Sequence, residues 1–278
     1  EIGSGLVGSE MCIRDSLFRE VHMEKLTMLD YVKETPGVLR TNIEQYTALV
    51  EPLMEEVQQK EIKRILLVAS GSSHNACYCA RSFVEKVSGL EVRIITPYTF
   101  TYYENDIKEN DLVLVVTQSG LSTNAIEALK IIKKKQCRAI CLTGNKNSDV
   151  KDVADVVIEY GVGEELVGYV TKGVSSLALF LDLFAIAYSG KSEYLEELKK
   201  AVHLNEEMIG KATSFIQLHY KEFSSMSWVY SCGAGANYGT ALESALKMGE
   251  TIHIPSCCYE IEEYIHGPNL QLTPQYNV

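Results

Sequence analysis

The chain has 278 residues, and its 26 Lys and Arg against 37 Asp and Glu give a net charge of −11. With 46% hydrophobic and 23% charged residues, the composition is that of a folded globular chain rather than a disordered one. The acidic balance argues against a protein that binds nucleic acid or an anionic membrane surface, but one locally positive pocket would suffice for a small anionic ligand.

The remaining composition argues against a membrane span and a metal site. The longest apolar stretch, 177–187, is interrupted by Asp182 and is shorter than the roughly 20 residues that cross a bilayer. The eight cysteines form no C-x-x-C pair typical of zinc, and we interpret them as reduced thiols. The sequence therefore predicts a cytoplasmic protein with no metal and no membrane partner.

The N-terminal residues 1–22 are interpreted as a non-native adapter or leader, because they show no helical or strand period. We expect the natural protein to start near Met23, and the same stretch found in genomic DNA ahead of Met23 would contradict this. Residues 23–60 have apolar positions at helical spacing and predict N-terminal helices. Pro36 and Gly37 are expected to divide them into two pieces.

Residues 61–195 alternate short apolar strands with helical stretches. Helices are predicted at 75–87, 124–134 and 148–153, and strands at 65–69, 92–95, 112–116, 139–142 and 156–158. Short strands rich in β-branched residues, alternating with helices, are typical of a parallel sheet covered on both faces. The fold class is therefore α/β, with one doubly wound parallel-sheet domain.

The rest of the chain is predicted to begin a second, similar unit. An apolar helix is expected at 172–188, followed by a helical stretch at 192–219 that Gly210 could divide. A strand at 228–232, a loop and a helix at 238–249 then repeat the order seen from residue 65 onward. We interpret 196–278 as a linker helix and a partial second domain, and we expect most of the second sheet to lie outside this chain.

Polar residues follow the strand predicted at 112–116, just before a helix. Four neutral donors lie within six positions: Thr117, Gln118, Ser119 and Ser122. Ligands of open α/β sheets bind at the carboxyl ends of strands, and a helix N-terminus suits a phosphate. The alternative is that one hydroxyl simply caps the helix, but a cap needs only one such residue. The segment therefore predicts an anion site.

The first strand ends in a similar way, at Ser70-Gly-Ser-Ser-His. Ser72 and Ser73 could donate hydrogen bonds to the same anion, because the two strand ends can be neighbours. Neither the G-x-G-x-x-G pattern of dinucleotide sites nor the G-x-x-x-x-G-K-[ST] pattern of the P-loop is present. We therefore expect a sugar phosphate as ligand and no nucleotide cofactor.

Charged residues in the second unit form the remaining candidate site. Glu243, Lys247 and Glu250 lie at i, i+4 and i+7, on one face of the predicted helix, although such a stripe is often only a solvated face. His266 precedes Gly-Pro, sixteen residues after Glu250, and is expected in a rigid turn. An imidazole has a pKa suited to proton transfer near neutral pH.

Taken together, these segments resemble the SIS (sugar isomerase) family of phosphosugar-binding proteins, from about Met28 to the end of the chain. The most specific elements are Thr-Gln-Ser-Gly-Leu-Ser from Thr117, Gly-Ser-Ser from Gly71, Ala-Leu-Glu-Ser-Ala-Leu-Lys-Met-Gly-Glu, and His-Gly-Pro. This combination is similar to the isomerase half of glucosamine-6-phosphate synthase and to the fructosamine and glucoselysine 6-phosphate deglycases. The resemblance implies two flavodoxin-like units and a homodimer with shared active sites.

The resemblance also implies roles for individual residues. Glu250 matches the family's general base, His266 matches the residue that assists ring opening, and Glu243 and Lys247 match supporting positions. The positions that match the family's 6-phosphate site are Ser73, Thr117, Gln118, Ser119 and Ser122.

The implied activity is a proton shuttle between C1 and C2 of an amino-sugar or fructosamine 6-phosphate, and we favour a deglycase. One alternative is an aldose–ketose isomerase or deaminase of the glucosamine-6-phosphate type. Another is a non-catalytic sensor of sugar phosphates. A third is that this chain, as a fragment, is itself inactive.

Overall fold

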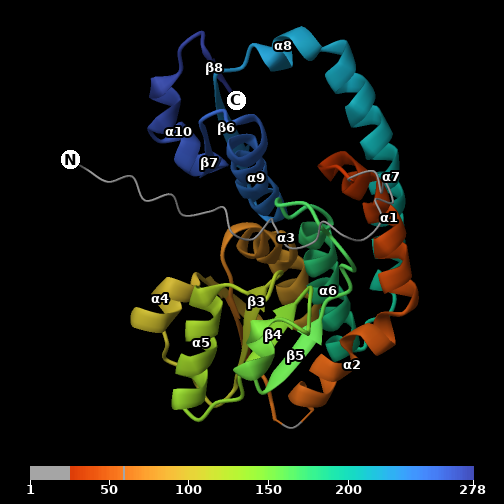
Figure 1. Ribbon diagram of the computed structural model, residues 1–278, viewed down its shortest axis with the longest axis vertical. Helices are drawn as coiled ribbons and strands as arrows, with labels where there is room; N and C mark the ends of the chain where they lie inside the picture. The colour runs from red at the N-terminus through yellow and green to blue at the C-terminus, as the bar shows by residue number, and fades with distance from the viewer. Residues whose placement is uncertain (1–25, 59) are drawn as a thin grey trace, which may run out of the picture.

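A computed structural model describes residues 26–58 and 60–278, so the adapter or leader interpreted at 1–22 lies outside the described residues. Within them, the first sheet has five parallel strands in the order β2-β1-β3-β4-β5 (Figure 1). These strands are β1 (Arg64–Val68), β2 (Glu91–Ile95), β3 (Asp111–Thr117), β4 (Ile140–Thr143) and β5 (Val156–Glu159). Each overlaps its predicted strand, with ends that differ by no more than one residue. The predicted α/β fold with a parallel sheet is confirmed.

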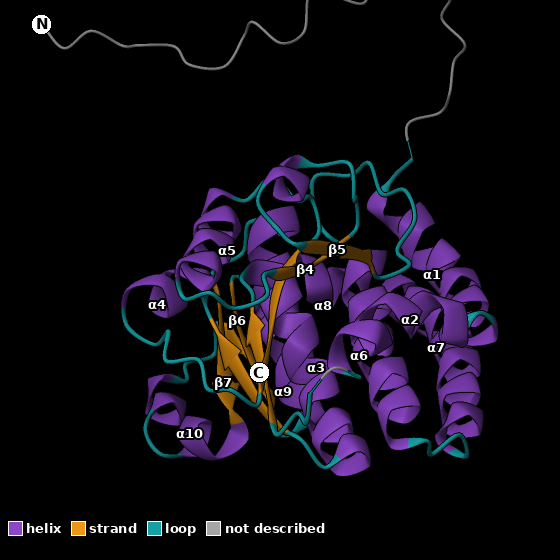
Figure 2. Ribbon diagram, turned by 90° about the horizontal axis from the view of Figure 1, so that it is seen from below, coloured by secondary structure: helices purple, strands orange, loops and turns teal. Residues whose placement is uncertain are grey.

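Helices lie on both sides of this sheet and form two hydrophobic cores (Figure 2). Leu67 and Leu114 belong to one core, whereas Leu66 and Val115 belong to the other, because successive strand residues point to opposite faces. The covering helices are α2 (Tyr46–Val57), α3 (Gly71–Ser88), α4 (Pro97–Tyr102), α5 (Thr123–Lys134) and α6 (Lys172–Ser189).

Two helical segments differ from the prediction in extent or type. Helix α3 begins at Gly71, four residues before its predicted start, so the serines at 72 and 73 lie in its first turn. The segment predicted at 148–153 is a short 3₁₀ turn, η1 (Asp149–Asp152). Helix α4 was not predicted.

The N-terminal helix α1 (Met28–Glu44) runs through Pro36, so the predicted break at Pro36 and Gly37 is wrong. The chain turns at Gln45 instead, where α2 begins. Proline removes one backbone hydrogen bond from a helix. Here Pro36 is buried together with Tyr31 and Leu39 on the face that packs against α6 and α7, and burial of that face outweighs the local cost.

Helix α6 packs in the core that contains Leu67 and Leu114. Among the described helices, it alone is long and apolar enough to cross a membrane, but 61% of it is buried inside the protein. The core helix of a soluble protein often has these properties.

Helix α7 (Tyr194–Leu218) passes unbroken through Gly210 and leads to the second unit (Figure 1). In the described part of the chain, the second sheet has three parallel strands in the order β7-β6-β8. The second unit comprises α8 (Tyr220–Ser224), β6 (Trp228–Gly233), α9 (Ala236–Lys247), a π-helical turn η2 (Met248–Ile252), β7 (Ser256–Glu260), α10 (Ile261–Ile265), η3 (Pro268–Gln271) and β8 (Tyr276–Asn277). Strand β6 and helix α9 repeat the order of β1 and α3, as predicted, whereas β7, α10 and β8 were not predicted.

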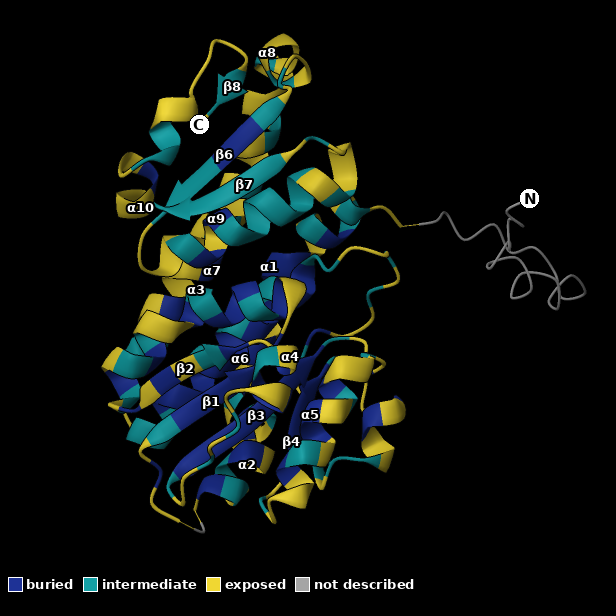
Figure 3. Cartoon of the chain, turned by 90° about the vertical axis from the view of Figure 1, so that its left-hand side faces the viewer, coloured by how far each residue is buried: buried dark blue, intermediate teal, exposed yellow. Residues whose placement is uncertain are grey.

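The second unit is less buried than the first (Figure 3). It is joined to the first by α7 and by the packing of α9 against α3. This packing is close because Gly239 lies at the contact. A Cβ atom added at Gly239 would come within 2.5 Å of the Cys79 nitrogen and 2.8 Å of the Asn75 carbonyl oxygen. A side chain at residue 239 would therefore push the two helices apart.

The Gly239→Ala variant is expected to lower the free energy of unfolding by about 1–3 kcal/mol, because an added methyl group has no space at this contact. Denaturant unfolding of the whole chain measures this change. Gly210→Ala is the matched control, because a Cβ there would meet no described atom within 4 Å and alanine favours a helix. Equal stability of the two variants would contradict the prediction.

Candidate functional site

A cavity of about 1130 Å³ lies at the carboxyl ends of the strands in the first sheet. It is lined by segments that follow four strands, at 70–73, 116–119, 144–145 and 161–168, and by Glu250 from the second unit. This is the edge of the sheet at which α/β proteins bind their ligands. Five residues from the predicted anion site line it, namely Ser72, Ser73, Thr117, Gln118 and Ser119.

The segment 117–122, which we call the 117–122 loop, is fixed by backbone contacts on the side of β4. The carbonyl oxygen of Gln118 accepts hydrogen bonds from the Gly144 nitrogen at 3.0 Å and from the Thr143 hydroxyl at 3.2 Å. Ser122 is the N-cap of α5, and its hydroxyl accepts a hydrogen bond from the Ala125 nitrogen at 3.4 Å. Ser122 therefore caps α5, which is the alternative that the sequence analysis considered for this segment.

Helices α3 and α5, which follow β1 and β3, both begin at this edge of the sheet. Ser73 is buried in the first turn of α3, and Thr117 is buried at the end of β3. Helix N-termini present unpaired N–H groups and partial positive charge. Together with these hydroxyls, they can bind a phosphate without a basic side chain.

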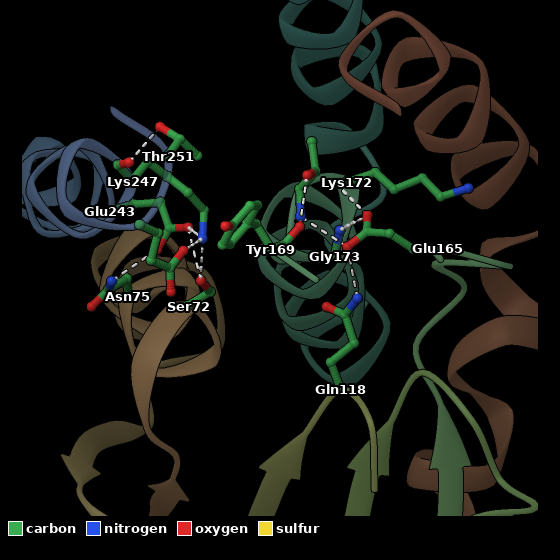
Figure 4. A network of polar contacts seen from close by, with 12 residues as sticks. Ser72, Asn75, Gln118, Glu165, Tyr169, Lys172, Gly173, Glu243, Lys247 and Thr251 are labelled. Atoms are coloured by element: carbon green, nitrogen blue, oxygen red, sulfur yellow. Dashed lines mark hydrogen bonds and ion pairs between the residues drawn. The ribbon is translucent and has the colours of Figure 1, made fainter. Parts of the chain in front are cut away.

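The carboxylates of the second unit form a network with the first turns of α3 (Figure 4). The Lys247 ammonium lies 3.0 Å from Glu243 and 2.7 Å from Glu250, so it pairs with both carboxylates. Glu243 also accepts hydrogen bonds from the Ser72 hydroxyl at 2.9 Å and from the Asn75 amide at 2.8 Å. The predicted stripe on α9 is therefore a bridge between the two units rather than a solvated face.

Ser72 is held by this network. Its hydroxyl donates to Glu243 and accepts a hydrogen bond from Lys247 at 3.0 Å. Glu250 is the most exposed of the three charged side chains, at 33%, against 15% for Lys247 and 13% for Glu243. It lies in the π-helical turn η2, a type of turn that is frequent at functional sites. Of these three side chains, Glu250 is the one that lines the cavity.

Two residues that the sequence analysis missed form a second network, at the N-terminus of α6 (Figure 4). The Glu165 carboxylate accepts a hydrogen bond from the Gln118 amide at 2.9 Å, and the Tyr160 hydroxyl donates to the other end of that amide at 3.1 Å. Burial raises the pKa of the Tyr160 hydroxyl, which keeps it protonated. Neither residue belongs to a recognisable local pattern, because their partner lies more than 40 positions away in sequence.

His266 is exposed at the C-terminal end of α10, and it is not among the described residues that line the cavity. Its Nδ1 atom lies 2.6 Å from the carbonyl oxygen of Glu262. A different histidine, His74, lies in the first turns of α3, and burial lowers its pKa. The structure thus brings Glu250 to the cavity but not the imidazole that was paired with it.

Comparisons with known proteins show which family this chain is similar to. Residues 60–187 match the family model described as the SIS domain. The chain is 26% identical over 255 residues to glutamine–fructose-6-phosphate aminotransferase (isomerizing) from Clostridium tetani, and 28% identical over 232 residues to the enzyme of the same name from Thermotoga maritima. These alignments cover 87% and 78% of this chain, but only 42% and 38% of the relatives. The chain thus spans about two fifths of the length of these curated relatives.

Solved structures show the same fold. A protein from Clostridium difficile 630, described as a candidate phosphosugar isomerase, has a TM-score of 0.81 and 27% identity, and the match covers 91% of this chain and 74% of that one. The C-terminal domain of glucosamine-fructose-6-phosphate aminotransferase from Francisella tularensis has a TM-score of 0.74 at 22% identity, over 93% and 76% of the two chains.

Proposed function

We propose that this chain, whose residues 60–187 form a SIS domain homologous to the isomerase domain of those aminotransferases, acts on an amino-sugar or fructosamine 6-phosphate by moving a proton between C1 and C2. The observation that carries the proposal is the position of Glu250. It comes from the second unit, yet it lines the same cavity as the 117–122 loop.

The proposed binding mode places the 6-phosphate between the first turn of α3 and the 117–122 loop. Ser73, Thr117 and Ser119 line the cavity there and supply hydroxyl donors. This contact is the same in the substrate and the transition state, so it orients the sugar and sets the affinity. The open-chain carbons C1 and C2 then lie toward Glu250.

The proposed chemistry needs one carboxylate that works as a base and then as an acid. Glu250 takes a proton from C1, the electron pair of that bond forms the C1–C2 double bond, and the C2 oxygen takes a proton from water as its double bond to C2 opens. Glu250 then returns its proton to C2, while the heteroatom on C1 forms a double bond to C1 and gives its own proton back to water. In a fructosamine 6-phosphate this turns a ketoamine into an aldimine, and water splits the aldimine into glucose 6-phosphate and an amine. Lys247 lies 2.7 Å from this carboxylate and holds it in place through a charge-assisted hydrogen bond.

The assay that tests this function uses the full chain with 6-phosphofructosyl-amino acids and with fructose 6-phosphate, and detects released glucose 6-phosphate. Glucose 6-phosphate from the fructosamine supports the deglycase that we favour. Turnover of fructose 6-phosphate, to glucose 6-phosphate alone or to glucosamine 6-phosphate with ammonia, supports the isomerase or deaminase branch that the names of the relatives suggest. Binding without turnover would contradict catalysis and favour a sensor.

We further propose that the active sites are shared within a homodimer, because His266 is exposed and is not among the described residues that line its own subunit's cavity. Glu250→Gln and His266→Asn are each expected to be inactive alone. A mixed preparation should regain about one quarter of the wild-type activity, since half of the dimers would be mixed and each would hold one intact site. Absence of any recovery, with mixed dimers verified by tagged pull-down, would contradict shared sites.

A further inference from the structure

We propose that Glu165 is a positioning residue for the phosphate: its carboxylate fixes the side chain of Gln118 and thereby the 117–122 loop. The inference rests on the proposed function, because it assigns a part of the phosphate-binding apparatus. Gln118 was expected to hold the phosphate with its own side chain. In the structure, both ends of its amide are engaged by the protein.

The Glu165 carboxylate is held by four N–H donors. Besides the Gln118 amide, it accepts hydrogen bonds from the backbone nitrogens of Thr171 at 2.8 Å, Lys172 at 2.7 Å and Gly173 at 3.3 Å. Three of these donors are backbone N–H groups at the N-terminus of α6, which have no partner within the helix itself. The positive end of the helix dipole stabilises a negative charge there. This end of α6 is therefore filled by a carboxylate of the same chain, so the phosphate is left to α3 and the 117–122 loop.

Gln118 is fixed by the chemistry of its partners. A carboxylate only accepts, so Glu165 takes the Nε2 end, and the Tyr160 hydroxyl donates to Oε1. The amide lies against the first turn of α6 (Figure 4), where a Cβ added at Gly173 would be 1.7 Å from Oε1. The amide thus has one orientation and no room to turn.

The backbone of Gln118 is fixed as well, through its carbonyl contacts to Thr143 and Gly144. The residues on either side of it, Thr117 and Ser119, line the cavity. A residue held at its side chain and at its carbonyl fixes the donors next to it before any ligand arrives. Such preorganisation raises affinity by lowering the cost of ordering the site.

The test is calorimetric titration of the full chain with inorganic phosphate and with fructose 6-phosphate. Glu165→Gln is expected to weaken both Kd values about tenfold and to leave kcat at saturation within about twofold, because the residue acts on binding and not on the proton shuttle. Asp155→Asn is the matched control. The Asp155 carboxylate also accepts a hydrogen bond from a backbone nitrogen, that of Ala139 at 2.9 Å, but at the opposite edge of the sheet. The Asp155→Asn variant should lower the free energy of unfolding without changing either Kd.

A double-mutant cycle separates positioning from simple helix capping. If Glu165 acts through Gln118, the pair Gln118→Leu/Glu165→Gln should bind phosphate no more weakly than Gln118→Leu alone. The positioning role would be overturned if the double variant weakened Kd by the product of the two single effects, or if Glu165→Gln left Kd unchanged.

If Glu165→Gln does not fold, Tyr160→Phe is the alternative test. It removes the hydroxyl that donates to Oε1 of Gln118 and should weaken Kd about threefold. An unchanged Kd in Tyr160→Phe would also overturn the positioning role. Failure of the wild-type chain to bind fructose 6-phosphate would instead contradict the proposed function itself.

Discussion

Replacement of Glu250 by glutamine is expected to lower kcat for the sugar 6-phosphate by about 10²–10⁴-fold, the usual contribution of a positioned general base. The amide has nearly the shape of the carboxylate but cannot take a proton from C1. Steady-state kinetics should therefore show the loss in kcat. Calorimetry should show a Kd within about threefold of wild type, because the phosphate contacts come from other residues.

Glu55→Gln is the control for this variant, because Glu55 is an exposed carboxylate on α2 that does not line the cavity. It should leave both kcat and Kd unchanged. If Glu250→Gln kept full kcat, or if it lost binding and kcat together, Glu250 would not be the base that performs the shuttle.

Replacement of Lys247 by methionine is expected to have the largest effect on stability. Lys247 lies between Glu243 and Glu250, and its loss leaves two carboxylates of one helical face without a counter-charge. Removal of one member of a buried ion pair costs about 3–5 kcal/mol, and partial exposure here reduces the expected loss to about 2–3 kcal/mol. Denaturant unfolding measures the loss, and kcat should fall too, because Glu250 loses the contact that holds it.

Lys199→Met is the matched control, since Lys199 and Glu196 form an exposed i,i+3 pair at 2.6 Å on α7. Such surface pairs contribute about 0–1 kcal/mol. The double variant Lys247→Met/Glu243→Gln should recover part of the lost stability, because it removes one of the two facing charges. Equal unfolding free energies for Lys247→Met and Lys199→Met would show that the network contributes nothing beyond a surface pair.

The first sheet was predictable because its local patterns agree with its packing. Each strand is a short apolar run bounded by polar residues, and its length and its β-branched residues distinguish it from a buried helix. The break at Pro36 was wrong because the residues that stabilise α1 lie on α6 and α7, which a local pattern does not include. Strand β8, of two residues, is too short to give a period.

The site was predictable in part for the same reason. Both strand ends carry their hydroxyl groups in one continuous segment, so the sequence could predict that Ser73 and Thr117 lie at the same end of the sheet, where both line the cavity. The contacts of Glu243 with Ser72 and Asn75 join residues 171 and 168 positions apart, and they depend on how α9 crosses α3. Glu165 was missed because a loop carboxylate gives no local sign that a distant helix end receives it.

We propose above all that the cavity at the ends of β1 and β3 holds a sugar through its 6-phosphate. Side-by-side calorimetric titration of the full chain with fructose 6-phosphate and with fructose tests it most directly. Fructose 6-phosphate is expected to bind at least about a hundredfold more tightly, since charge-assisted hydrogen bonds to the phosphate supply most of the affinity. Equal affinities for the two sugars, or no binding of the phosphorylated one, would contradict the claim.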